Sequence, residues 1–160
     1  MDGTQLVAVV TAGAAAVVDV RSRRIPNWLT GGMLLFGLLA HGWLAGGPGV
    51  LAALGGAVLG AALLLPFYVM RAMGAGDVKL LAALGAVLGP QVLVSVAIYA
   101  AVAGGIMSVL ILAARGRLGI ALGELYLQRR SPTRSGLTAP YGVAIASGVF
   151  LSLLLPSVLG

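Results

Sequence analysis

Carboxylic acids are rare in this sequence, which contains only Asp2, Asp19, Asp77 and Glu124. Asp19 and Asp77 border long apolar runs, whereas Asp2 is near the N-terminus and Glu124 is in a polar stretch. A carboxylate next to hydrocarbon is costly, so it normally faces a protein interior or a water-filled cavity and marks a functional site. Asp19 and Asp77 are therefore the candidate catalytic residues.

Two carboxylates held close together do not ionise together easily, and they share a proton near neutral pH. One then takes a proton from water as general base, and the other protonates the scissile carbonyl oxygen as general acid. This is aspartic protease chemistry, which needs no metal ion, cofactor or covalent intermediate. The sequence has no cysteine. Its single histidine, His41, is predicted to be a solvated loop residue on the other side of the molecule, which argues against a serine triad.

The segment Gly74-Ala75-Gly76 directly precedes Asp77. Glycine permits close backbone approach and unusual backbone angles, so a peptide could lie against this loop beside the carboxylate. Asp77 is also predicted to open a helix. The alternative to a catalytic role is therefore that Asp77 serves only as a helix N-cap. For Asp19 the alternative to a catalytic role is that it marks the end of the apolar run and pairs with one of the arginines that follow it. Lys79 is either a snorkelling anchor or a charge partner of Asp77.

The elements that must position these residues are apolar. Of the 160 residues, 60% are hydrophobic and 9% are charged, against about 25% charged in soluble domains. A membrane-spanning helix needs roughly 20 apolar residues. We therefore expect an all-α polytopic membrane protein, with about six transmembrane helices in a single domain over residues 1–160. The apolar runs cover residues 6–18, 28–45, 50–70, 80–88, 92–114 and 139–159.

The ten Lys and Arg residues indicate an orientation. If six spans alternate from an N-terminus outside, all ten fall on one face, and the outside turns at 41–49 and 89–91 carry none. The positive-inside rule then makes the basic loops cytoplasmic and places Asp19 and Asp77 on that side. Topology thus explains the net charge of +6 better than nucleic-acid binding does. Since no basic residue precedes the first apolar run, we expect a retained helix rather than a cleaved signal.

Two further features concern packing and loops. The polar stretch 115–136 is either an amphipathic helix on the cytoplasmic leaflet or a loop folded over the domain. Small residues allow helices to pack closely in lipid. This predicts helix contacts at Gly55, Gly56, Gly60, Gly104, Gly105 and Gly148.

Three motifs together resemble those of type IV prepilin peptidases, which are GxGD-type membrane aspartyl proteases. Asp19 is followed seven positions later by Pro26 and then Asn27. The second motif is Gly74-Ala75-Gly76-Asp77-Val78-Lys79, and the third is Pro140-Tyr141-Gly142. Their order and spacing are similar to the family pattern over nearly the whole chain.

The resemblance implies an endopeptidase of the bacterial inner membrane that removes the basic leader from prepilin or pseudopilin precursors. Cleavage would follow a leader glycine on the cytoplasmic side, with Asp19 and Asp77 as the catalytic pair. No cofactor or metal is implied. The resemblance assigns Gly74, Gly76 and Lys79 to support of the catalytic loop. Residues that could border the substrate groove are Arg23, Pro26, Asn27, Pro140, Tyr141 and Gly142.

The sequence also departs from the long members of that family, which carry a region with Cys-x-x-Cys motifs and methylate the new N-terminus. This chain has no cysteine, so we expect cleavage without methyl transfer. It is similar to the short peptidases of Tad/Flp pilus systems, and archaeal preflagellin peptidases are a related short form. The alternative class is a non-catalytic transporter or pilus-assembly scaffold that uses Asp19 and Asp77 for ion coupling or packing.

Overall fold

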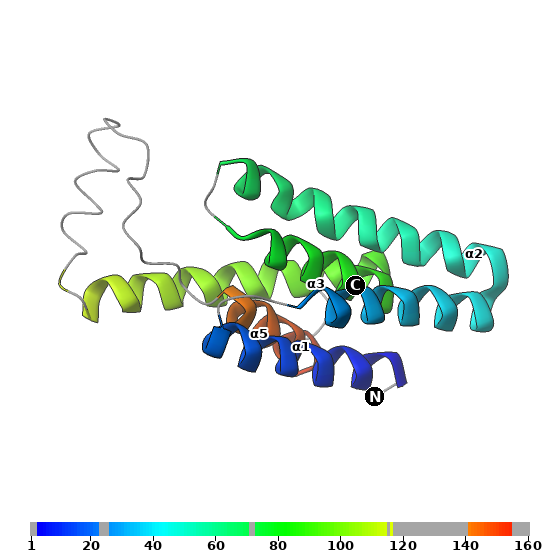
Figure 1. The fold of residues 1–160 in the computed structure, drawn as a ribbon, viewed down its shortest axis with the longest axis horizontal. Helices are drawn as coiled ribbons and strands as arrows, with labels where there is room; N and C mark the ends of the chain where they lie inside the picture. Colours follow the sequence, from blue (N-terminus) through cyan, green and yellow to red (C-terminus); the bar gives the residue numbers. More distant parts are fainter. Residues whose placement is uncertain (1–2, 23–25, 71–72, 115, 117–140, 155–160) are drawn as a thin grey trace.

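The computed structural model describes residues 3–22, 26–70, 73–114, 116 and 141–154 (Figure 1). These residues form four helices and no strand: α1 (Gly3–Ser22), α2 (Asn27–Val69), α3 (Ala75–Ala114) and α5 (Tyr141–Leu154). The prediction of an all-α protein is confirmed for this part of the chain. Almost all of the polar stretch 115–136 lies outside the described residues.

The two long helices are each interrupted at a glycine. Gly46 in α2 has φ +62°, and Gly89 in α3 has φ +78°. Such angles favour glycine because it has no Cβ. Pro48 and Pro90 follow closely. Proline suits the first turn of a new helical segment because it lacks an N–H, and the N–H groups of a first turn have no intrahelical partner. Figure 1 shows α2 and α3 folding back at these points, which confirms both predicted turns.

Helix α3 is the centre of the bundle and contacts each of the other three described helices. It contributes most of the buried side chains, including Leu80, Leu84 and Leu93. Helices α1 and α5 add smaller faces to the same cluster. The core is thus built on a helix that begins two residues before Asp77, so packing fixes the position of that residue's backbone.

Glycines bring α3 into backbone contact with its neighbours. A Cβ at Gly56 or Gly60 in α2, or at Gly148 in α5, would overlap a backbone carbonyl of α3. The predicted helix contacts are therefore confirmed at these three positions. They are wrong at Gly55 and Gly105, where an added Cβ would meet nothing within 4 Å. Neighbouring helical residues point about 100° apart, so adjacent glycines cannot both face one partner.

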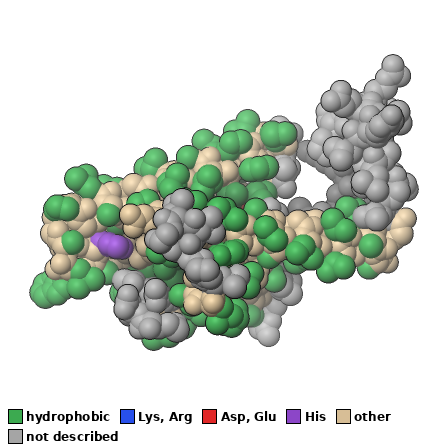
Figure 2. All heavy atoms as spheres, turned by 180° about the vertical axis from the view of Figure 1, so that it is seen from behind, with side chains coloured by type: hydrophobic (Ala, Val, Ile, Leu, Met, Phe, Trp, Pro, Cys, Tyr) green, Lys and Arg blue, Asp and Glu red, His purple; other side chains and the backbone are tan. Residues whose placement is uncertain are grey.

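The outer surface is apolar. Trp43 is 91% exposed, Leu44 76% and Leu51 70%. Figure 2 shows a face of the described atoms covered by hydrophobic side chains and backbone, with no charged side chain visible on it. Soluble monomers rarely expose apolar patches of this extent. Two helices, α2 and α3, are long and apolar enough to cross a membrane. These features point to a membrane protein.

The prediction that His41 is a solvated loop residue is wrong. His41 lies inside α2 and is half-buried, and its Nε2 is 3.1 Å from the carbonyl oxygen of Val87 in α3. Val87 precedes the break at Gly89, and carbonyls at a helix end lack regular intrahelical partners. The imidazole supplies such a partner, so His41 joins α2 to the turn of α3.

Candidate active site

Asp19 is placed by the buried face of α1. Ala8, Ala12 and Ala15 are at most 1% exposed, and Asp19 continues their spacing at 8% exposed. Residues three and four apart share one face of a helix. The end of α1 therefore directs this carboxylate into the bundle rather than to the surface. The three alanines are a signal in the sequence that Asp19 is buried.

The start of α5 meets the Asp19 carboxylate. The backbone N–H of Gly142 donates a hydrogen bond of 2.9 Å to Asp19 Oδ2. Gly142 is the second residue of α5, and N–H groups in a first turn have no intrahelical partner. The positive end of the helix dipole lies at the same place. Asp19 thus caps α5 from another helix.

Gly142 is the residue type that this contact requires. A Cβ there would be 2.9 Å from Asp19 Oδ2 and 3.0 Å from Asp19 Cβ. Contacts that short would force one of the two helices to move. Sequence reasoning assigned Gly142 only to a possible substrate groove and missed its contact with Asp19, because no spacing in a single sequence links residues so far apart.

Asp77 is the third residue of α3. Its Oδ2 accepts a hydrogen bond of 3.3 Å from the Gly74 N–H, and its own N–H donates one of 3.2 Å to the Gly74 carbonyl. A side chain at the third helical position that reaches back to the N-cap N–H is half of a capping box. Asp77 therefore caps α3 from inside the first turn, and not as the N-cap residue itself.

The backbone angles of the two glycines before Asp77 differ from the prediction. Among the described residues, φ is positive at Gly46, Gly89 and Gly116. It is positive at neither Gly74 nor Gly76. The unusual angles that a Gly-x-Gly loop permits are therefore not used here, because Gly76 already belongs to the first turn of α3. Gly74 is exposed, which leaves the backbone beside Asp77 accessible.

The structure brings Asp19 and Asp77 together. Figure 1 shows the end of α1 and the starts of α3 and α5 at the same end of the bundle. The two carboxylates are close enough for the charge of Asp19 to act on Asp77. Each also accepts a backbone N–H, from Gly142 and Gly74 respectively. Two carboxylates on separate helices thus share one electrostatic environment.

Lys79 and Asn27 form a second contact between motifs. Lys79 Nζ donates a hydrogen bond of 3.0 Å to Asn27 Oδ1. Asn27 begins α2 directly after Pro26, whose backbone angles are extended. The two residues border an open depression of about 300 Å³, together with Thr30 and Leu34. The bond that the structure gives Lys79 therefore ties α3 to α2, whereas sequence reasoning considered Asp77 as its partner.

The other predicted site residues are only partly covered. Arg23 and Pro140 lie outside the described residues, and of Tyr141 the structure describes the helical backbone alone. Nor do the described side chains include a group of three or more His, Asp or Glu that could hold a metal ion.

Comparison with known sequences gives the class of the protein. Residues 6–109 match the sequence model of the type IV leader peptidase family. The chain belongs to the type IV leader peptidase family. The resemblance drawn from its motifs is confirmed, and membership supports a leader-peptidase type of activity. No curated protein and no solved structure matches the chain. The matched range includes Asp19 and Asp77 but ends before Gly142.

Proposed function

We propose that this leader peptidase is an aspartic endopeptidase whose catalytic pair is Asp19 and Asp77. It removes the basic leader from prepilin-like or pseudopilin precursors by cutting after a leader glycine. The observation that carries the proposal is the convergence of the two carboxylates, from α1 and α3, at one end of the bundle. Family membership supports the class of reaction, and this convergence supports the choice of Asp19 and Asp77.

The reaction needs only these two groups and water. One carboxylate takes a proton from a water molecule, whose oxygen attacks the scissile carbonyl carbon. The other group, in its protonated form, gives its proton to the carbonyl oxygen. The resulting gem-diol collapses with cleavage of the C–N bond, and a proton passes to the departing amine. The products are the leader carboxylate and the new N-terminus, and the pair returns to its shared-proton state.

Accessible backbone beside the pair suits a peptide substrate. Gly74 is exposed next to Asp77 and has no side chain, so an extended peptide can approach the carboxylate there. Gly74, Gly76 and Lys79 support this catalytic segment. The proposed groove is bordered by Arg23, Pro26, Asn27, Pro140, Tyr141 and Gly142, of which Gly142 also positions Asp19.

The proposed setting is the bacterial inner membrane, with six spans and the N-terminus outside. The breaks at Gly46 and Gly89 support six spans, because they divide α2 and α3 into two apolar arms each. Together with α1 and α5 these arms make six apolar segments. The ten basic residues of the sequence then face the cytoplasm by the positive-inside rule. The catalytic pair lies on that side, where a basic leader can reach it.

The test removes one carboxylate at a time. Asp19→Asn and Asp77→Asn are each expected to lower cleavage of a purified pilin precursor by roughly 10³-fold or more, because members of one catalytic unit do not substitute for each other. Asp2→Asn is the matched control, since it removes the same charge outside the pair. If either of the first two variants cleaves at the normal rate, the proposed pair is wrong.

A further inference from the structure

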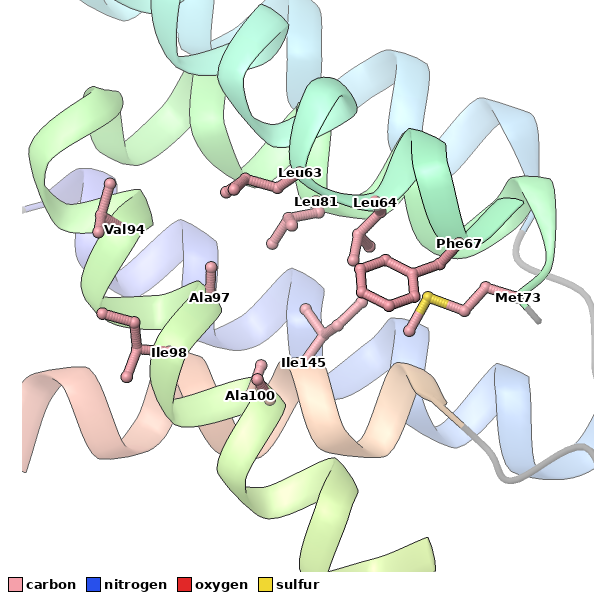
Figure 3. Close-up of a pocket in the computed structure, with 11 residues that line it drawn as sticks. Leu63, Leu64, Phe67, Met73, Leu81, Val94, Ala97, Ile98, Ala100 and Ile145 are labelled. Carbon is pink, nitrogen blue, oxygen red and sulfur yellow. The ribbon is translucent and has the colours of Figure 1, made fainter. Parts of the chain in front are cut away.

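Two hollows in the structure differ in chemistry. The cavity of Figure 3, between α2, α3 and α5, has a volume of about 260 Å³ and an apolar lining that includes Phe67, Met73 and Ile145. The open depression of about 300 Å³ beside Asn27 and Lys79 has a charged residue on its border. Of the two, the depression alone offers both a charge and an apolar wall to one ligand.

The depression is polar at one end and apolar at the other. Asn27 and Lys79 border it where α2 and α3 begin. A Cβ at Gly37 would overlap the backbone of Ala86, so the two helices run side by side in the same direction from this end. Leu34 borders the depression two turns after Asn27, which is about 10 Å further along the helix. The border thus changes from an amide and an ammonium group to hydrocarbon along its length.

The depression opens onto the apolar outer surface of α2. Trp28, Gly31 and Leu35 lie on one face of that helix, and Trp28 is 75% exposed and Leu35 57%. Gly31 is exposed and borders the depression, and a Cβ built on it would meet nothing within 4 Å. The missing side chain leaves a notch between two large exposed ones, which lipid of a surrounding bilayer can enter.

Lys79 decides which headgroup suits this position. An ammonium group has three N–H donors, and Asn27 is the acceptor that the described residues give it, at 3.0 Å. Asn27 is a neutral amide, so this bond adds no counter-charge and leaves donors for a ligand. Tryptophan concentrates at the membrane–water interface, and Trp28 directly follows Asn27. The positive charge is therefore expected at the depth of lipid headgroups.

Volume and charge limit the occupant further. A cavity of about 150 Å³ is large enough to bind benzene, so the depression of about 300 Å³ has room for a phosphate group and the first methylenes of an acyl chain. A helix is about 10 Å across with its side chains and is too wide. The basic leader expected of the substrate has the same sign of charge as Lys79, which disfavours it here.

We propose that this depression binds an anionic phospholipid of the surrounding bilayer, with the phosphate on Lys79 and the start of an acyl chain against Gly31 and Leu34. The proposal uses the membrane setting but not the assignment of the catalytic pair. Lys79 also holds the start of α2 through Asn27. One side chain therefore serves both the bound lipid and the link between α2 and α3.

The test measures lipid selectivity beside Trp28. The sequence has two tryptophans, and Trp43→Phe removes the other one, so that the remaining fluorescence reports on the surroundings of the depression. The protein is placed in vesicles of phosphatidylglycerol and phosphatidylcholine with the same acyl chains. One lipid is brominated in each series, because bromine quenches tryptophan fluorescence only at short range. The two quenching curves give the binding constant of the anionic lipid relative to the zwitterionic one.

Four further variants are made in the Trp43→Phe protein. Lys79→Met removes the charge and keeps an unbranched side chain, whereas Lys79→Arg keeps the charge. Gly31→Leu fills the depression from α2. Gly32→Leu is the matched control, because Gly32 is also exposed and open to a Cβ but does not border the depression. Circular dichroism checks that each variant retains its helices.

Phosphatidylglycerol is expected to bind about 5-fold more strongly than phosphatidylcholine, because one lysine near an anionic headgroup has an effect of that order. Lys79→Met should bring the ratio close to one, and Gly31→Leu should lower it. Lys79→Arg and Gly32→Leu should keep it. Millimolar inorganic phosphate should leave the ratio unchanged, because free phosphate lacks the acyl chain that fills the apolar end.

Several results would overturn the proposal. A ratio near one before any further substitution shows no selectivity, and a ratio that survives Lys79→Met comes from basic residues elsewhere. If Gly31→Leu and Gly32→Leu behave alike, the lipid does not enter the depression. Loss of the preference on adding inorganic phosphate would identify a site for free phosphate instead of a lipid. Each arm measures binding and not cleavage, so failure here leaves the proposed function standing, and failure of that function leaves the lipid site standing.

Discussion

The Gly142 N–H lies 2.9 Å from Asp19 Oδ2, and a Cβ on Gly142 would reach the same oxygen at 2.9 Å. The first turn of α5 therefore fixes Asp19 in two ways, through a hydrogen bond and through direct packing. Asp77 has no such steric constraint, because a Cβ on Gly74 would meet its Oδ2 at an ordinary 3.6 Å. The position of Asp19 thus depends on α5, and that of Asp77 on the start of its own helix.

Gly142→Ala is expected to lower precursor cleavage by roughly 10- to 100-fold, because a shift of about 1 Å in a catalytic group has an effect of that size. The matched control is Gly13→Ala in α1, where a Cβ would meet nothing within 4 Å. Cleavage rates and thermal unfolding in detergent measure both variants. Wild-type activity in Gly142→Ala would show that α5 does not hold Asp19 in its working position.

Much of this site was predictable from the sequence. The scarcity of acids singled out Asp19 and Asp77, and the turns at Gly46 and Gly89 follow from glycines with a proline one or two positions later. What single-sequence reasoning missed are contacts between distant segments, such as Gly142 with Asp19 and His41 with Val87. Composition and periodicity predict which elements form, but a hydrogen bond between two helices depends on how those helices pack.

Gly56→Ala is expected to lower the free energy of unfolding by roughly 1–3 kcal/mol, because its Cβ would overlap the carbonyl of Gly85. Gly55→Ala is the matched control, because Gly55 is the neighbouring glycine in the same helix. It places the Cβ in open space and should stabilise α2 by up to about 1 kcal/mol, since alanine loses less backbone entropy than glycine. Thermal unfolding in detergent measures the difference. Equal effects would contradict backbone contact between α2 and α3.

His41→Leu is expected to destabilise the protein by roughly 1–3 kcal/mol, because it leaves the Val87 carbonyl without the imidazole partner. His41→Gln keeps an N–H donor and should recover part of that loss. Because His41 lies near the turn of α2, away from the carboxylate pair, cleavage well below the unfolding temperature should be unchanged in both variants. A His41→Leu protein as stable as wild type would mean that this contact adds nothing to stability.

The hydrogen bond between Lys79 and Asn27 is best tested by a double-mutant cycle. Both residues are exposed, so the coupling energy in unfolding experiments should be small, about 0.5 kcal/mol.

Cleavage is the more informative measurement. If the bond acts only by holding the start of α2 against α3, then Lys79→Ala, Asn27→Ala and the double variant should lower kcat/KM by similar factors. If Lys79 also contacts the precursor, Lys79→Ala will cost more than Asn27→Ala, and the excess will appear in KM. If the losses of kcat/KM in the two single variants add up fully in the double variant, the two residues act independently. The hydrogen bond between them then contributes nothing to cleavage.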